Sequence, residues 1–206
     1  MKIVTHDGPF HADDVFAYAV LRAALGDIQL VRSRDPAVID RADLVFDVGS
    51  VYDPATRRYD HHMRERPLRA CGTPYSSVGL IWRDYGRAAF PSLLQTDALD
   101  KNLWELIWRD IDMGLILAID QADNGVAPAG PGHLSAVIEA FNADWDSVKS
   151  HDQAFLEASQ FATGILARAG QQVHASARAM VLPLRAARAW IVRAACAASG
   201  SLGRAA

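Results

Sequence analysis

This 206-residue chain has little cysteine, no long apolar run and no excess of basic residues. Its two cysteines, Cys71 and Cys196, share no close motif, which excludes a disulfide framework and fits a reducing compartment. Charges interrupt every apolar stretch before it reaches the roughly 20 residues of a membrane-spanning helix. The chain also opens directly on a strand-like run, without a secretory signal. We therefore expect a soluble, cytoplasmic protein with no membrane partner.

The charge balance narrows the function further. A formal net charge of -3 argues against a protein that binds nucleic acid through a generic basic surface. It does not exclude an enzyme that meets phosphate groups through metal ions. Because 50% of the residues are hydrophobic, a chain of this length can form a substantial core, in one large domain or two small ones.

Short apolar runs alternate with helical patterns in the first part of the chain. Strands are expected at residues 2–5, 29–32, 44–48 and 57–59, with a turn at 52–55. Helices are expected from Asp13 or Asp14, as the cap, to Gly26, and again at about 37–41. This alternation predicts an α/β fold with a doubly wound parallel sheet.

The rest of the sequence is predominantly helical. Helices are expected from Ser76 or Ser77 onward, over about 97–123 as one continuous element, over 134–141, and over 150–182 as a long connector. The preceding segment, 63–74, contains Arg64, Arg66 and Arg69. We interpret it as a solvated loop, with a phosphate-facing lid as the alternative.

Acidic and histidine residues gather where the expected strands end. They form three groups: His6, Asp7, His11, Asp13 and Asp14; Asp47; and Asp60, His61 and His62. Ligands of doubly wound sheets bind beyond the carboxyl ends of the strands, so these groups should converge. Imidazole and carboxylate together suit manganese, zinc or iron.

The number of these residues fits a pair of metal ions. Two divalent ions about 3.5–4 Å apart can neutralise a phosphoryl group and activate a water, and they share a bridging carboxylate. A single structural zinc would need four ligands and usually cysteine, which is missing here. The candidate ligands are His6, His11, Asp13, Asp47, His61 and Asp123, with Asp60, His62 and Asp120 in reserve.

Four motifs in order give a specific resemblance. They are His6-x4-His11-x-Asp13, Val45-Phe46-Asp47-Val48-Gly49, Tyr59-Asp60-His61-His62 and Ala122-Asp123-Asn124-Gly125. This order resembles the DHH phosphoesterase superfamily. The flanking words Thr5-His6-Asp7-Gly8, Phe10-His11-Ala12-Asp13, Arg34-Asp35-Pro36 and Val51-Tyr52-Asp53-Pro54 look like the melanocyte-proliferating-gene (Myg) exonuclease family, over about residues 1–181.

The resemblance implies a manganese-type, two-metal 3′-to-5′ exoribonuclease or a related phosphoesterase, acting on RNA or a small phosphodiester. It implies that His6, His11 and Asp13 hold one ion, that Asp47 bridges, and that His61 and Asp123 complete the second site. Many DHH enzymes carry Asp at the position of His11, which leaves the identity of the metal open.

The resemblance also implies roles around the metals. Asp60 would orient an imidazole, His62 would face the scissile phosphate, and Asp120 would be a second-shell or alternate ligand. Arg32 and Arg34 are candidate phosphate contacts, with ordinary solvated charges on a surface strand as the alternative.

The family normally continues into a second α/β domain with a Gly-Gly substrate loop. Here we expect a catalytic domain at 1–149, the connector helix at 150–182, and an Ala/Arg-rich tail at 183–206 in place of that second domain. One alternative is therefore a truncated, inactive metal-binding remnant, or an interaction module that forms a homo-oligomer through the helix. Inorganic pyrophosphatase chemistry is less favoured, because the flanking words do not match.

Overall fold

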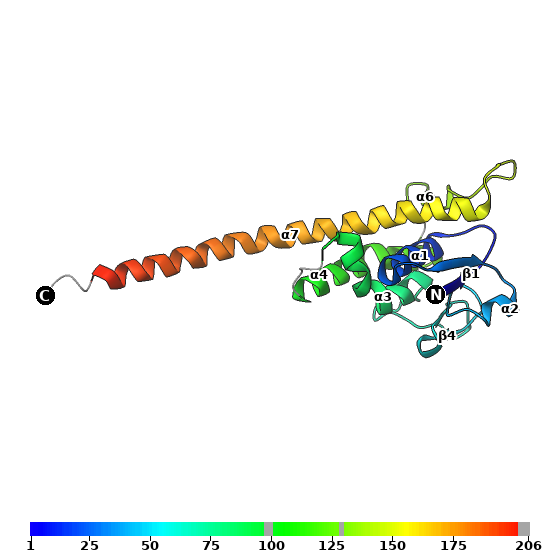
Figure 1. The fold of residues 1–206 in the computed structure, drawn as a ribbon, viewed down its shortest axis with the longest axis horizontal. Helices are drawn as coiled ribbons and strands as arrows, with labels where there is room; N and C mark the ends of the chain where they lie inside the picture. Colours follow the sequence, from blue (N-terminus) through cyan, green and yellow to red (C-terminus); the bar gives the residue numbers. More distant parts are fainter. Residues whose placement is uncertain (97–100, 128–129, 202–206) are drawn as a thin grey trace.

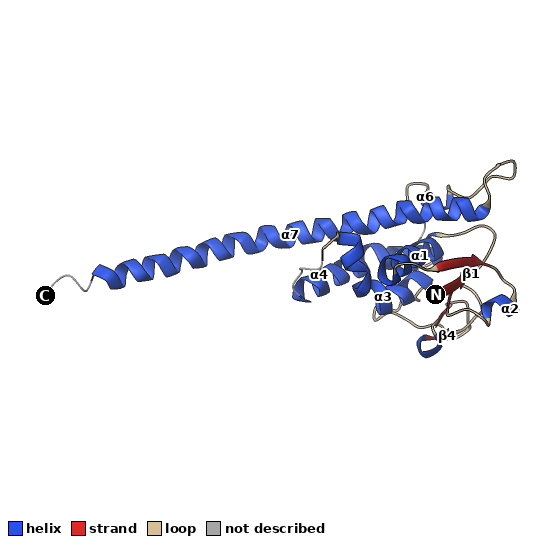
Figure 2. Ribbon diagram, in the orientation of Figure 1, coloured by secondary structure: helices blue, strands red, loops and turns tan. Residues whose placement is uncertain are grey.

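The computed structural model describes residues 1–96, 101–127 and 130–201. Its sheet has five strands in the order β2-β1-β3-β5-β4. Figure 2 shows the strands in red and the helices in blue. The strands are β1 (Lys2–Thr5), β2 (Gln29–Arg32), β3 (Leu44–Phe46), β4 (Tyr52–Asp53) and β5 (Arg58–Tyr59). All neighbours are parallel except β4, which runs antiparallel to β5. The predicted doubly wound α/β sheet is confirmed, with an antiparallel edge.

The helices cover the two faces of the sheet unequally. On one face, α1 (Ala12–Leu25) and α3 (Ser77–Leu94) pack a large core that includes Phe16, Phe46 and Trp82. On the other, the short α2 (Pro36–Ile39) contributes to a small cluster around Val4 and Val45. Ile3 and Val4 of β1 and all of β3 are buried, so these positions are apolar on both faces of the sheet and do not alternate with polar residues.

The start of α1 differs from the prediction that Asp13 or Asp14 caps the helix. The N-cap is His11, and both aspartates lie buried in the first turn. The carboxylate of Asp14 reaches back and accepts the backbone N–H of His11 at 3.0 Å, as an acid at the third helical position does in a capping box. The predicted end is confirmed, because Gly26 caps the helix with a φ of 77°.

Between residues 52 and 59 the expected turn is a small hairpin. After β4, a 3-10 helix, η1 (Pro54–Thr56), turns the chain, and Arg57 takes a left-handed φ of 57° before β5 begins. The hairpin brings Asp60 back beside residue 51, whose carbonyl accepts the N–H of Asp60 at 3.0 Å. The last strand therefore ends at the same edge as β1 and β3.

The helix expected over 97–123 is interrupted. Its predicted start lies outside the described residues, and α4 (Lys101–Ile111) leads into a π-helical turn, η2 (Asp112–Ile116), and then α5 (Leu117–Asp123). The π turn shifts the buried face by one residue, because Ile111 and Ile116 are buried five positions apart. The partly buried Leu115 lies four positions after Ile111, which makes the apolar stripe look continuous in the sequence. The next helix, α6 (Leu134–Glu139), is shorter than expected.

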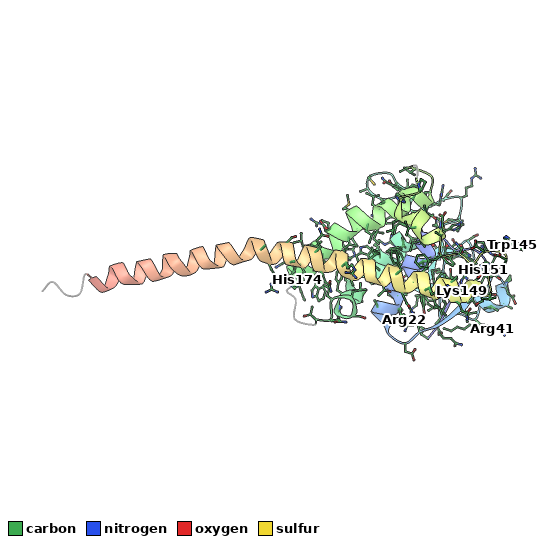
Figure 3. The ribbon with its side chains drawn as sticks, turned by 90° about the horizontal axis from the view of Figure 1, so that it is seen from above. Arg22, Arg41, Trp145, Lys149, His151 and His174 are labelled. Carbon is green, nitrogen blue, oxygen red and sulfur yellow. The ribbon has the colours of Figure 1, made fainter. Side chains whose placement is uncertain are left out.

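The last helix, α7 (His151–Ser201), packs on the body only over its first part. Ala154, Phe155, Ala158, Ala162 and Leu166 are buried, and the helix then extends far beyond the rest of the molecule (Figure 1). Seen from above, His174 lies where the helix leaves the body (Figure 3). The backbone helix continues through residue 201, past the predicted end at 182. None of the described helices is long and apolar enough to cross a membrane.

Candidate metal centre

The carboxyl edge of the sheet gathers acidic and histidine side chains from five segments. His6 follows β1, Asp47 follows β3, and the segment 60–62 follows β5. The first turn of α1 adds Asp13 and Asp14, and the last residue of α5 is Asp123. The predicted convergence of distant groups is therefore present in the structure. Three sets of described residues could each hold a cation, and the first two share Asp47: Asp47, Asp60, His61 and His62; His6, Asp14 and Asp47; and His11, Asp13 and Asp123.

Asp47 lies at the middle of this centre. Its Oδ2 is 3.3 Å from Nε2 of His6, and its Oδ1 is 3.3 Å from Nε2 of His61. Ser77 donates its hydroxyl to Oδ1 at 2.9 Å. The backbone of Asp47 has a φ of 54°, a left-handed conformation that is costly for a residue other than glycine. Each oxygen of one carboxylate therefore faces a different imidazole.

His61 faces further carboxylates. Its Nε2 is 3.6 Å from Oδ2 of Asp13 and 3.4 Å from Oδ2 of Asp123. Asp13 is held by the backbone N–H of Ser77, which donates to Oδ2 at 3.3 Å. One side of Asp47 is thus occupied by an imidazole and two carboxylates, with His11 beside the latter.

His6 forms the other side of the centre. Its Nδ1 is 3.0 Å from the carbonyl oxygen of Asp7, so with the hydrogen on Nδ1 this nitrogen donates and Nε2 is left as a lone-pair donor towards the carboxylates. Nε2 is 3.2 Å from Oδ2 of Asp14. The sequence placed Asp14 in the acidic cluster but gave it only a capping role. Its distance from His6 along the chain offered no signal that the two side chains meet.

Asp60 holds the ring of His62 rather than that of His61. Its Oδ1 is 2.7 Å from Nδ1 of His62 and also accepts the backbone N–H groups of both histidines, while Ser50 donates its N–H to Oδ2. The His62 side chain is 58% exposed, in contrast to the buried His6 and His61. With the hydrogen on Nδ1, Nε2 of His62 is free to meet a bound molecule.

Burial and mutual repulsion shift the pKa values of the centre. Burial raises the pKa of Asp13 well above its usual range, and the charges of Asp47 and Asp123 add to the effect. Burial would also raise the pKa of Asp47, but hydrogen bonds with His6 and His61 lower it instead. Burial would lower the pKa of His6, whereas its bonds to Asp14 and Asp47 raise it to about 10. Because these buried carboxylates repel one another, a bound cation would stabilise their ionised forms.

The donor atoms fit a metal by a second observation. Oδ1 of Asp13 is buried and has no hydrogen-bond partner, and the buried Oδ2 of Asp14 faces Nε2 of His6 at 3.2 Å. Buried carboxylate oxygens without partners are costly, and coordination to a cation removes that cost. The set of nitrogen and oxygen donors, without sulfur, suits manganese, zinc or iron.

A cavity of about 380 Å³ opens onto the centre. This volume lies at the lower end of the range of roughly 300–1,000 Å³ for small-molecule sites. Its lining comes from α1, the ends of β3 and β5, the 63–75 loop, the end of α5 and α6: His11, Ala12, Asp47, His61, His62, Arg66, Ala122, Asp123, Asn124, Ser135 and Glu139.

The two arginines expected to contact phosphate are not part of this lining. The Arg32 side chain is buried; it donates to the carbonyl oxygen of Gly8 at 2.6 Å and lies 4.7 Å from the ring centre of Phe155. It therefore braces α7 against the sheet, and it is not a solvated surface charge either. The exposed Arg34 lies 3.5 Å from Asp7.

Asp120 and Arg69 also differ from their expected surroundings. Oδ1 of Asp120 accepts the N–H and hydroxyl of Ser76, and its Oδ2 accepts Nε of Arg69. Asp120 belongs to none of the three sets of possible cation ligands. Arg69 is buried, so the interpretation of segment 63–74 as a solvated loop is wrong at this residue.

Comparison with known proteins identifies the family. The sequence model of the MYG1 exonuclease family, described as an uncharacterised protein family (UPF0160), matches residues 2–194. A MYG1 protein of Schizosaccharomyces pombe is 34% identical over 182 residues, which cover 81% of this chain and 55% of the relative. The human MYG1 exonuclease is 32% identical over 166 residues, covering 70% and 43%, and the mouse MYG1 exonuclease is 32% identical over 171 residues, covering 74% and 45%.

The chain thus spans about half the length of the curated relatives that it matches. No solved structure gives a significant match. The range matched by the family model, residues 2–194, contains all the acidic and histidine residues of the centre. The chain belongs to the MYG1 exonuclease family.

Proposed function

We propose that this chain is a divalent-metal-dependent phosphodiesterase that removes nucleotides from the 3′ end of RNA. The observation that carries the proposal is the position of Asp47, whose two oxygens face His6 and His61 separately. A carboxylate shared between two cations needs this arrangement. The relatives named MYG1 exonuclease support a nuclease.

The residues divide into two sets around Asp47. His6 and Asp14 would hold one ion with Asp47, and Asp13, His61 and Asp123 would hold the other. This division moves Asp13 away from the His6 site, to which the resemblance assigned it. His11 lies beside Asp13 and Asp123, with its ring centre 6.3 Å from that of His6, so it is within reach of either set. The two ions, manganese in this proposal, would supply charge neutralisation and activation of a water.

His62 is the candidate proton donor for the leaving oxygen. Asp60 fixes its ring, and the hydrogen bond that His62 donates to Asp60 raises the pKa of His62, which favours the protonated form near neutral pH. His62 lines the cavity, so a phosphoester bound there can meet its free nitrogen. The small cavity favours a terminal unit of a polymer over an internal one, which supports exonuclease action.

The test is hydrolysis by purified protein with Mn²⁺. Substrates are 3′-labelled RNA, 5′-labelled RNA, a simple chromogenic phosphodiester and pyrophosphate, with Asp47→Asn as the inactive control. Early release of the 3′ label as mononucleotide supports the proposal, whereas release of phosphate from pyrophosphate alone would favour pyrophosphatase chemistry. If none of the substrates is hydrolysed while Mn²⁺ is bound, catalysis by this chain is rejected.

A second candidate is a non-enzymatic module that binds metal and pairs with a second copy through α7. The observation that favours it is the extension of α7 beyond the body (Figure 1). Light scattering after size exclusion, compared with turnover, separates the candidates. A dimer that binds Mn²⁺ without turnover supports the module, and an active monomer excludes it.

A further inference from the structure

The segment between β5 and α3 brings an arginine to the mouth of the cavity. Arg66 lines the cavity together with His62 and Asp123, and among the described lining residues it is the one arginine or lysine. Its Nη1 donates to Oδ1 of Asn124 at 2.7 Å. Asn124 follows Asp123 directly, so this contact joins the arginine to the metal centre through adjacent residues.

The backbone around Arg66 is held on the body. Residues 67–75 form a closed loop, in which Arg69 donates its N–H to the carbonyl of Thr73 at 2.8 Å and Tyr75 donates to that of Pro67 at 3.1 Å. The amide of Asn124 donates to the carbonyl of Pro74 at 3.2 Å, which ties this loop to the end of α5. The backbone that directly follows Arg66 is therefore held in place by hydrogen bonds, which limits where its guanidinium can lie.

The charges around Arg66 indicate the kind of ligand it would meet. Its contact with Asn124 is to a neutral amide and uses one of five N–H donors. Asp47, Asp123 and Glu139 line the cavity, and the proposed cations would offset the charge of the two aspartates. A guanidinium facing such a site can bind two oxygens of a phosphate in its planar fork.

We infer that Arg66 binds a phosphate group of the substrate at the mouth of the cavity, with Asn124 holding its guanidinium in place. The inference rests on the proposed function, because it assigns the phosphate to the substrate of that site. Arg32 and Arg34, the phosphate contacts expected from the sequence, do not line this cavity.

The experiment measures binding of inorganic phosphate to the full chain, with and without Mn²⁺, by calorimetry. Arg66→Gln should weaken binding at least about 10-fold, the effect of losing a charge-assisted hydrogen bond. Arg66→Lys should fall between Arg66→Gln and the wild type, because it keeps the charge and loses the fork. The matched control is Arg64→Gln, an exposed residue of the same segment outside the cavity lining, which should bind within about two-fold of the wild type. Mn²⁺ content and melting temperature should not change in any of the three variants.

The outcomes separate this inference from the proposed function. If Arg66→Gln binds phosphate as tightly as the wild type, or if the wild type binds none in either state, the inference is wrong. If the chain binds no Mn²⁺, the proposed metal-dependent function is wrong, whatever the result for Arg66. The role of Arg66 would still be supported if the metal-free wild type binds phosphate and the metal-free Arg66→Gln variant does not.

Discussion

Arg69 and Asp120 form a buried ion pair, with 2.5 Å between Nε and Oδ2, that fastens the 63–75 loop to α5. The same guanidinium contacts Asp112, in the π-helical turn, at 2.9 Å through Nη1. Ser76 completes the surroundings of Asp120 from the start of α3. Because Asp123 lies one turn after Asp120, this network determines where a metal-facing carboxylate sits, although none of its members belongs to the centre.

Replacing Arg69 by Gln should strongly destabilise the fold. The change leaves Asp112 and Asp120 without their cation, and breaking a buried ion pair in this way costs about 3–5 kcal/mol. Urea denaturation of the metal-free chain measures the loss, with Arg64→Gln as the exposed control, expected within about 0.5 kcal/mol of wild type. Equal stability of the two variants would show that the pair contributes little.

Removal of Asp47 and removal of Asp123 should have different effects on metal content. Asp47→Asn takes away the carboxylate between His6 and His61, so both ions should be lost. Asp123→Asn affects the His61 side alone, so one ion should remain. Mn²⁺ per chain after equilibrium dialysis provides the measurement. Identical stoichiometry in the two variants would rule out Asp47 as the shared ligand.

Topology explains why the sequence predicted the meeting of His6, Asp47 and His61. Each of them follows a strand of one parallel sheet, and strand ends are readable from short apolar runs. The pairing of side chains within the centre was not readable in this way. The contact of His6 with Asp14 depends on how the first turn of α1 rotates once His11 becomes its cap.

Burial was equally hard to infer for the arginines. Arg32 and Arg69 appear in polar-looking segments, yet each is enclosed by elements distant in sequence, including α7 and α5. A charged residue gives no sign of its partner when that partner lies 51 positions away, as Asp120 does from Arg69. Local pattern therefore located the strand ends but not the ionic network beneath them.

His62→Gln should retain metal and lose rate. The His62 side chain is largely exposed and its ring forms a hydrogen bond with Asp60. Removal of this ring should therefore leave Asp47, His6 and His61 in place. Loss of a general acid lowers kcat by about 10²–10⁴-fold. Asp60→Asn should lower the pKa of His62 and move the alkaline limb of the pH–rate profile to lower pH. An unchanged profile, or Mn²⁺ loss in His62→Gln, would contradict this role.

Metal should stabilise the chain more as pH rises from about 6.5 to 9. In the metal-free state the pKa of His6 is raised from 6.5 to about 10, so the folded form binds more protons and loses stability as pH increases through this window. Burial and repulsion also raise the pKa of Asp13, so this carboxyl keeps its proton to higher pH in the folded form than in the unfolded one. Metal competes with these protons, so its affinity increases with pH. Melting curves with Mn²⁺ and with a chelator should diverge as pH rises, and a constant difference would exclude proton competition.

Gly79→Ala tests whether the network of Arg69, Asp120 and Ser76 determines the position of Asp123. A Cβ at residue 79 would lie 2.5 and 2.6 Å from the carboxylate oxygens of Asp120, too close for either to stay in place. The displaced carboxylate should cost about 1–3 kcal/mol in stability, the range for overpacking, and weaken Mn²⁺ binding through Asp123.

The matched control for this substitution is Gly164→Ala in α7, where nothing lies within 4 Å of the added atom. There alanine should stabilise the helix by up to about 1 kcal/mol and leave Mn²⁺ affinity unchanged. Stability from urea denaturation and affinity from Mn²⁺ titration are both needed, because a purely structural role for Gly79 would lower the first and spare the second. Such a result would separate the Arg69–Asp120 pair from the metal centre, since displacement of Asp120 would then not reach Asp123.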